Sequence, residues 1–201
     1  MDEILRKLVT PGGSTCRFFE GAHGTGKTHL TQLVEEAALR RTFAVARLDL
    51  SQALSLRDWT LVTRVILGSI VLEIDSDSFR GLPSILQRLS ELRGINPDEL
   101  ETANLPHPGF RAAMMHALRP ADLSDDASSL LSQFLLGERI SATRLRSVGV
   151  RDVKNPLTAR NSEQVLHTVF GGLHHIGLSG TVLLFDENDR TFDVGSATPN
   201  W

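Results

Sequence analysis

The 201-residue sequence predicts an α/β fold with a parallel sheet, and three features of the chain predict it. Near the N-terminus, a glycine-rich octapeptide separates a short apolar run from a helical stripe. A second apolar run occupies residues 43–50, and a third, at residues 181–187, ends in two acidic residues. Unbroken apolar runs are typical of parallel strands that are buried on both faces. We therefore expect a single domain over residues 1–201.

The first predicted strand, residues 16–20 (Cys-Arg-Phe-Phe-Glu), leads directly into the octapeptide. The octapeptide matches the phosphate-binding pattern G-x-x-x-x-G-K-[ST], and its members are Gly21, Ala22, His23, Gly24, Thr25, Gly26, Lys27 and Thr28. In this motif backbone N–H groups converge on the β-phosphate, the lysine neutralises charge near the γ-phosphate, and the hydroxyl ligates Mg²⁺. We expect Lys27 and Thr28 to take these two roles, and the backbone of all eight residues to bind phosphate.

A helix is predicted after the loop, because apolar residues recur there at helical spacing: Leu30, Leu33, Val34, Ala37 and Ala38. The motif therefore lies between a strand and a helix, which is the context that phosphate binding requires. The run Phe-Ala-Val-Ala-Arg-Leu-Asp-Leu at residues 43–50 is the second predicted strand.

A large helical insertion, residues 52–160, is predicted between the second and third strands, since this stretch shows almost no strand pattern. Prolines and glycines divide it into segments. Including the helix that follows the insertion, helices are expected at residues 61–70, 82–92, 109–118, 123–136 and 162–176.

The third predicted strand, residues 181–187, ends in Asp186 and Glu187. Open α/β sheets bind ligands at the carboxyl ends of their strands. We expect Asp186 to hold Mg²⁺ opposite Thr28, and Glu187 to polarise a water for attack on the γ-phosphorus. The expected strand order is 16–20, 181–187, 43–50, with the acidic strand in the centre.

The nucleotide is predicted to be ATP. A GTPase would be expected to show a D-x-x-G switch and an N-K-x-D guanine-binding motif. Asp186 is not followed by a glycine at the fourth position, and no N-K-x-D occurs in the chain.

The composition excludes other classes of protein. A net charge of −3 gives no overall attraction to nucleic acid or to an anionic membrane. The longest apolar stretch, residues 65–72, is too short to cross a bilayer. Cys16 is the single cysteine, which excludes a disulfide framework and favours the cytoplasm.

Three segments together resemble a known family. They are the loop from Gly21 to Leu30, the strand from Val45 to Ser51, and the Gly-Leu-Ser-Gly lead-in at residues 177–180 with the acidic strand that follows. They are similar to the P-loop ATP-binding proteins of BREX phage-defence systems, which are additional-strand, catalytic-glutamate ATPases related to AAA+ proteins. The resemblance implies a P-loop ATPase in a multi-protein anti-phage assembly, alongside DNA-handling partners.

The chain departs from this family pattern after the acidic strand. Members of the class continue with a polar sensor strand, a further strand and a helical lid, whereas only fourteen residues follow Glu187 here. We therefore expect an incomplete sheet. Either the chain is a fragment, or it completes its sheet with a partner. A second copy of the chain, in a homo-oligomer, is one candidate for that partner.

The leading hypothesis is an Mg²⁺-dependent ATPase that is weak in isolation, because an arginine supplied by a neighbour can contribute about 10³–10⁵ in rate. One alternative is a small-molecule kinase with the arginine-rich segment 139–160 as its lid, although Glu187 argues against an enzyme that must exclude water. A second alternative is a non-hydrolysing nucleotide switch or scaffold. DNA contact through segment 139–160 is a third.

Overall fold

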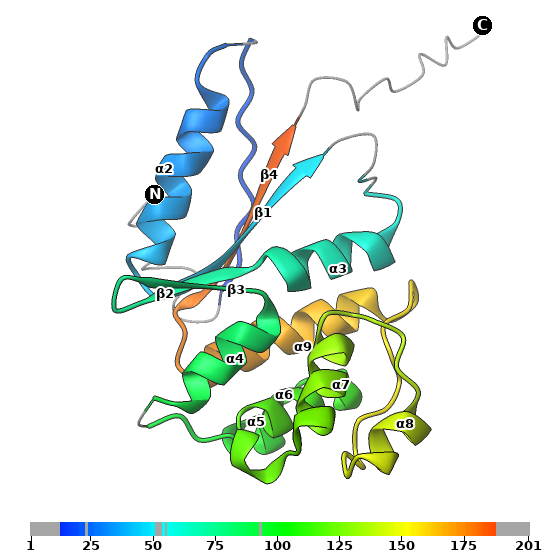
Figure 1. The fold of residues 1–201 in the computed structure, drawn as a ribbon. Coiled ribbons are helices and arrows are strands. Elements are labelled where there is room, and N and C mark those ends of the chain that lie inside the picture. The colour runs from blue at the N-terminus through cyan, green and yellow to red at the C-terminus, as the bar shows by residue number, and fades with distance from the viewer. Residues whose placement is uncertain (1–12, 23, 51–53, 55, 93, 188–201) are drawn as a thin grey trace, which may run out of the picture.

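The computed structural model describes residues 13–22, 24–50, 54, 56–92 and 94–187. Its centre is a four-stranded mixed sheet with strand order β3-β2-β1-β4, flanked by helices on both faces (Figure 1). The strands are β1 (Phe43–Leu50), β2 (Val71–Ile74), β3 (Asp77–Arg80) and β4 (Gly180–Glu187). The fold is therefore α/β, as predicted, but the sheet is not wholly parallel.

The two long strands, β1 and β4, are neighbours and run parallel. Their register extends over eight residue pairs, from Phe43 opposite Gly180 to Leu50 opposite Glu187. The sequence prediction that residues 43–50 and 181–187 form adjacent parallel strands is confirmed. The carboxyl ends of both strands consequently lie at one end of the sheet (Figure 1).

The hairpin formed by β2 and β3 was not predicted. Both pairings, β1 with β2 and β2 with β3, are antiparallel. The two turn residues, Asp75 and Ser76, have φ angles of 53° and 73°, and two-residue hairpin turns of this kind match the twist of the flanking strands. The sequence prediction missed this hairpin because only Gly68 and Ser69 separate the apolar stripe of helix α3 (Trp59–Ser69) from the apolar start of β2.

The predicted strand at residues 16–20 is also absent. Residues 13–22 form no regular secondary structure, and Phe18 and Phe19 are 93% and 49% exposed. No strand pairing joins this segment to the sheet among the described residues, so nothing fixes it as a strand. As a result, β4 lies at the edge of the described sheet and not at its centre, which corrects the predicted order.

Helix α2 (Lys27–Leu39) covers one face of the sheet, and the other helices lie on the opposite side (Figure 1). There, α3 packs against β1 and α9 (Ser162–His175) packs against β4, with further helices behind them. The five helices predicted within residues 61–176 are all present, with bounds within two residues of the prediction, and α2 is the helix predicted after the loop. The remaining elements are α4 (Leu82–Ser90), α5 (Glu99–Thr102), α6 (Pro108–Ala117), η2 (Pro120–Asp122), α7 (Asp125–Leu135) and α8 (Ala142–Ser147).

Alternate residues of β1 contribute to two separate apolar cores. Phe43 and Val45 point toward α2 and belong to a small core that includes Val34, Ala38 and Leu39 of that helix. The intervening residues belong to a much larger core with the helices of the other side: Ala44, Ala46, Leu48 and Leu50. The sheet is therefore held mainly by the helical side, and α2 is attached through the smaller core.

Candidate nucleotide site

The octapeptide Gly21–Thr28 leads into α2 and includes its first two residues, at the end of the sheet toward which β1 and β4 point (Figure 1). This is the end at which α/β sheets bind ligands. The loop residues Gly21, Ala22, Gly24, Thr25, Gly26 and Thr28 are exposed, and Lys27 is half-buried. His23, the other predicted phosphate-binding residue, lies outside the described residues.

Two glycines give the loop its backbone conformation. Gly24 and Gly26 have φ angles of 80° and 87°, a region that other residues rarely adopt. Gly26 is also the N-cap of α2, and no side chain caps this end. The first turn of α2 contains no acidic residue, so no acidic side chain of that turn offsets the positive end of the helix dipole. Such a helix start is suited to binding an anion.

Lys27 bends back over the loop. Its Nζ donates hydrogen bonds to the carbonyl oxygens of Gly21, at 2.7 Å, and Ala22, at 3.0 Å. A lysine ammonium has three donors, so these two bonds leave one for a ligand oxygen. The Thr25 hydroxyl also donates to the Ala22 oxygen, at 2.8 Å, and closes the turn. The loop therefore holds a positive charge beside the uncapped helix start.

Asp186, the predicted metal ligand, is held by an arginine of the neighbouring strand. Arg47 Nη2 donates to Asp186 Oδ2 at 2.7 Å. The same guanidinium approaches α2, where its Nη1 lies 3.9 Å from Glu35 Oε2. These three side chains are between 22% and 31% exposed, so all of them are largely shielded from solvent. Arg47 thus links the acidic strand to the helix that begins at the phosphate loop.

The structure pairs the predicted metal ligand Asp186 with Arg47, and among the described residues no hydrogen bond joins Asp186 to Lys27 or Thr28. Asp186 is bound to Arg47, whose other acidic neighbour, Glu35, follows Thr28 by seven residues on α2. Seven helical residues correspond to about 10 Å along the axis. Glu187 is opposite Leu50 in the strand register, and its side chain lies outside the described part of the chain.

The donor types present fit a magnesium ion that is bound mainly by phosphate oxygens. A threonine hydroxyl and one carboxylate are hard oxygen ligands of the kind Mg²⁺ takes alongside nucleotide phosphates. No group of three or more His, Cys, Asp or Glu side chains that could hold a metal occurs among the described residues. A site made entirely of protein side chains is therefore not found there, and Thr28 and Asp186 stay the predicted ligands of an ion that would be bound together with a nucleotide.

Sequence reasoning missed Arg47 as part of this site. The sequence does contain a pattern that indicates this role, because Arg47 is a charged residue between the buried Ala46 and Leu48 in a mainly apolar strand. A charge in such a position requires an acidic partner nearby. Its position in the parallel register, beside the strand that ends in two acids, identifies that partner.

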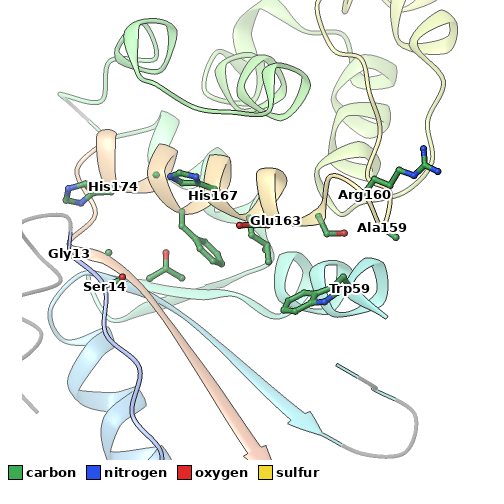
Figure 2. A pocket seen from close by; sticks show the side chains of 14 residues that line it. Gly13, Ser14, Trp59, Ala159, Arg160, Glu163, His167 and His174 are labelled. Atoms are coloured by element: carbon green, nitrogen blue, oxygen red, sulfur yellow. The ribbon is translucent and has the colours of Figure 1, made fainter. Parts of the chain in front are cut away.

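A cavity of about 890 Å³ lies at the opposite end of β4. Gly13 and Ser14 line it beside the start of β4, and α9 forms another wall with His167 and His174 (Figure 2). None of the described loop residues 21–22 and 24–28 lines this cavity, and Thr181, which does, lies five residues before Asp186. The cavity is therefore separate from the phosphate loop.

Comparison with protein families identifies a related family. Residues 2–89 match the model of the family described as BREX system ATP-binding protein BrxC/D. Neither the comparison with curated proteins nor that with solved structures yields a match. In the described part of the chain, no helix has the length and apolarity needed to cross a membrane. The matched residues include the phosphate loop, α2, β1 and Arg47, and this confirms the resemblance seen in the sequence: residues 2–89 are similar to the BREX system ATP-binding proteins BrxC/D.

Proposed function

We propose that this protein binds and hydrolyses ATP with Mg²⁺, as a component of a bacterial phage-defence assembly in the cytoplasm. The observation that carries the proposal is the arrangement of Lys27 over the loop, with its Nζ bonded to the Gly21 and Ala22 oxygens beside the uncapped start of α2. This arrangement concentrates donors and positive charge where a triphosphate would bind. The family match supports ATP as the nucleotide.

Each residue of the site has a distinct role in the proposal. Backbone N–H groups of residues 21–28 bind the phosphates, and Lys27 neutralises charge that develops on the γ-phosphate. Thr28 and Asp186 hold Mg²⁺, which when bound neutralises phosphate charge. Glu187 accepts a proton from the attacking water. Other protein chains, a second copy of this chain or DNA are its proposed partners in the assembly.

The proposal includes a P-loop sheet in which residues 16–20 pair in parallel with the free edge of β4, next to the parallel pair of β1 and β4. Two observations support this pairing. Gly13 and Ser14 line the same cavity as Gly180 and Thr181, so the segment starts beside the beginning of β4 (Figure 2). The outer edge of β4 has no strand neighbour among the described residues, and Phe185 on this strand is 44% exposed. An unpaired edge of this kind accepts a further strand.

The test compares two variants of the site. Glu187→Gln should retain ATP binding and lose release of phosphate, because the amide cannot accept a proton. Lys27→Ala should instead weaken ATP binding by about 10- to 100-fold, as expected for loss of charged hydrogen bonds. Glu36→Gln, on the exposed side of α2, is the control and should change neither quantity.

The measurements are nucleotide affinity by calorimetry and phosphate release without an added acceptor. Phosphate release without an acceptor excludes the small-molecule kinase. ATP binding without release in the parent protein, even when partners are supplied, would favour the switch or scaffold. Failure of the parent protein to bind ATP would contradict the proposal altogether.

A further inference from the structure

Arg47 has acidic neighbours on two different elements, and it bonds to them unequally. Its Nη2 makes a 2.7 Å hydrogen bond to Asp186 on β4. Its Nη1 is 3.9 Å from Glu35 on α2, which is an ion pair without a hydrogen bond. Since the guanidinium already lies within ion-pair distance of both carboxylates, a small rotation can change which one it bonds to.

The strand register explains why Asp186 requires a cation. In the parallel register, Asp186 lies directly opposite Asp49 of β1. Residues directly opposite on neighbouring strands share a face of the sheet, and like charges in such positions repel. Arg47 precedes Asp49 by two residues on the same strand, so it projects from the same face. It therefore supplies the nearest positive charge that the structure shows for Asp186.

We propose that Arg47 is a positioning residue that holds the Asp186 carboxylate in the nucleotide-free protein and releases it when Mg²⁺–ATP binds, turning to Glu35. The inference rests on the proposed function, because Asp186 is the proposed magnesium ligand. Arg47 and the divalent cation then compete for one carboxylate. The competition lowers the contribution of Mg²⁺ to nucleotide affinity, and it couples release of Asp186 to the helix that follows the phosphate loop.

Competition for the Asp186 carboxylate predicts opposite effects when Arg47 and Glu35 are replaced. Arg47→Gln removes the competing charge, so the ratio of ATP affinity with Mg²⁺ to ATP affinity in EDTA should rise by about fivefold, the value of one partly shielded ion pair. Glu35→Gln removes the second acceptor and keeps Arg47 on Asp186, so the same ratio should fall by about fivefold. A purely structural role for Arg47 would weaken binding in both variants and in both conditions.

The experiment uses a fluorescent ATP analogue titrated into the full chain, with excess Mg²⁺ and with EDTA, and circular dichroism to verify folding. Arg40→Gln is the matched control, because it breaks an exposed pair with Glu36 on the same helix, 3.6 Å apart, and should leave the ratio unchanged. If Arg47→Gln does not fold, Arg47→Met, which keeps much of the aliphatic stem but carries no charge, should give the rise in this ratio, and Glu35→Gln should give the fall.

An unchanged ratio in both Arg47→Gln and Glu35→Gln, or a change of the same sign in the two, would overturn the inference. The proposed function has a different point of failure, which is loss of nucleotide binding in the parent protein. A parent protein that binds ATP equally well with Mg²⁺ and with EDTA would also overturn the inference. Mg²⁺ would then not replace Arg47 at the Asp186 carboxylate.

Discussion

Gly109, in the first turn of α6, lies against the backbone of Lys154. A Cβ atom on Gly109 would be 1.7 Å from the Lys154 carbonyl oxygen and 2.9 Å from its carbonyl carbon. The contact joins α6 to the segment that leads toward α9. Since the obstruction is backbone and not the end of a side chain, it cannot rotate away.

Gly109→Ala should therefore destabilise the protein by about 3 kcal/mol, the upper range for overpacking. Urea denaturation followed by circular dichroism measures the change. Gly68→Ala is the matched control, because its nearest neighbour would be Leu136 Cδ2 at 4.0 Å. Gly68 lies within α3, so alanine there should stabilise by up to about 1 kcal/mol through helix propensity. Equal destabilisation in the two variants would show that the Lys154 contact is not the cause.

Protein stability should fall as the pH drops below about 6.5, and His107 is the reason. His107 is 2% exposed, and its Nδ1 accepts a hydrogen bond from the Phe110 backbone N–H at 3.1 Å. The backbone N–H of His107 donates to Thr168 Oγ1 at 2.8 Å. Burial lowers the pKa of His107 below its ordinary value. The unfolded chain then binds a proton that the folded chain excludes, so stability is full above the unfolded pKa and is lost as pH falls toward the folded one.

The expected slope from this group is at most about 1.4 kcal/mol per pH unit. Urea midpoints between pH 5 and pH 8 measure it. His107→Asn retains an acceptor for the first turn of α6 but has no titrating ring, so its acid slope should be smaller. The same slope in His107→Asn and in the parent protein would assign the pH dependence to other groups.

A disulfide should form between Cys16 and a cysteine introduced at residue 183. Ser14 and Thr181 line the same cavity, and continuing from them in parallel register places Cys16 opposite Leu183. Neighbouring strands are about 4.8 Å apart, which is within the range that a disulfide spans. Because Cys16 is the single cysteine, Leu183→Cys creates one pair only, and non-reducing electrophoresis after mild oxidation detects it.

Ser78→Cys is the control for this experiment, since it lies on β3 at the other edge of the sheet. It should form no intramolecular bond with Cys16. If both variants react at the same rate, residues 16–20 sample many positions, and the proposed pairing with β4 is wrong.

The features that the sequence predicted correctly depend on local patterns. The strand Phe43–Leu50 is an unbroken apolar run apart from Arg47 and Asp49, and its partner β4 has the same character. The helix stripes were equally clear, as in α4, whose buried residues are Leu82, Ile85, Leu86 and Leu89. These patterns reflect burial on one or both faces, which is set within a single segment.

The features that were missed depend on neighbours. Phe18 and Phe19 look like strand residues, but strand formation needs a hydrogen-bonded partner, and no local pattern states whether one is present. The role of Arg47 likewise follows from its distance to Asp186, 139 residues away in the chain. His107 was missed because histidine is not among the residues that usually cap helices.

The buried residues of α2 are Val34, Ala38 and Leu39, which all belong to its C-terminal half. The first two turns, which follow directly from the phosphate loop, have no buried residue. Helical turns without tertiary packing are only marginally stable in water. Amide hydrogens in these turns should therefore exchange rapidly with deuterium in the ligand-free protein, while those of β1 and α9 stay protected. A bound triphosphate would slow that exchange, so ordering of the N-terminal turns of α2 would be the first sign that a ligand has bound.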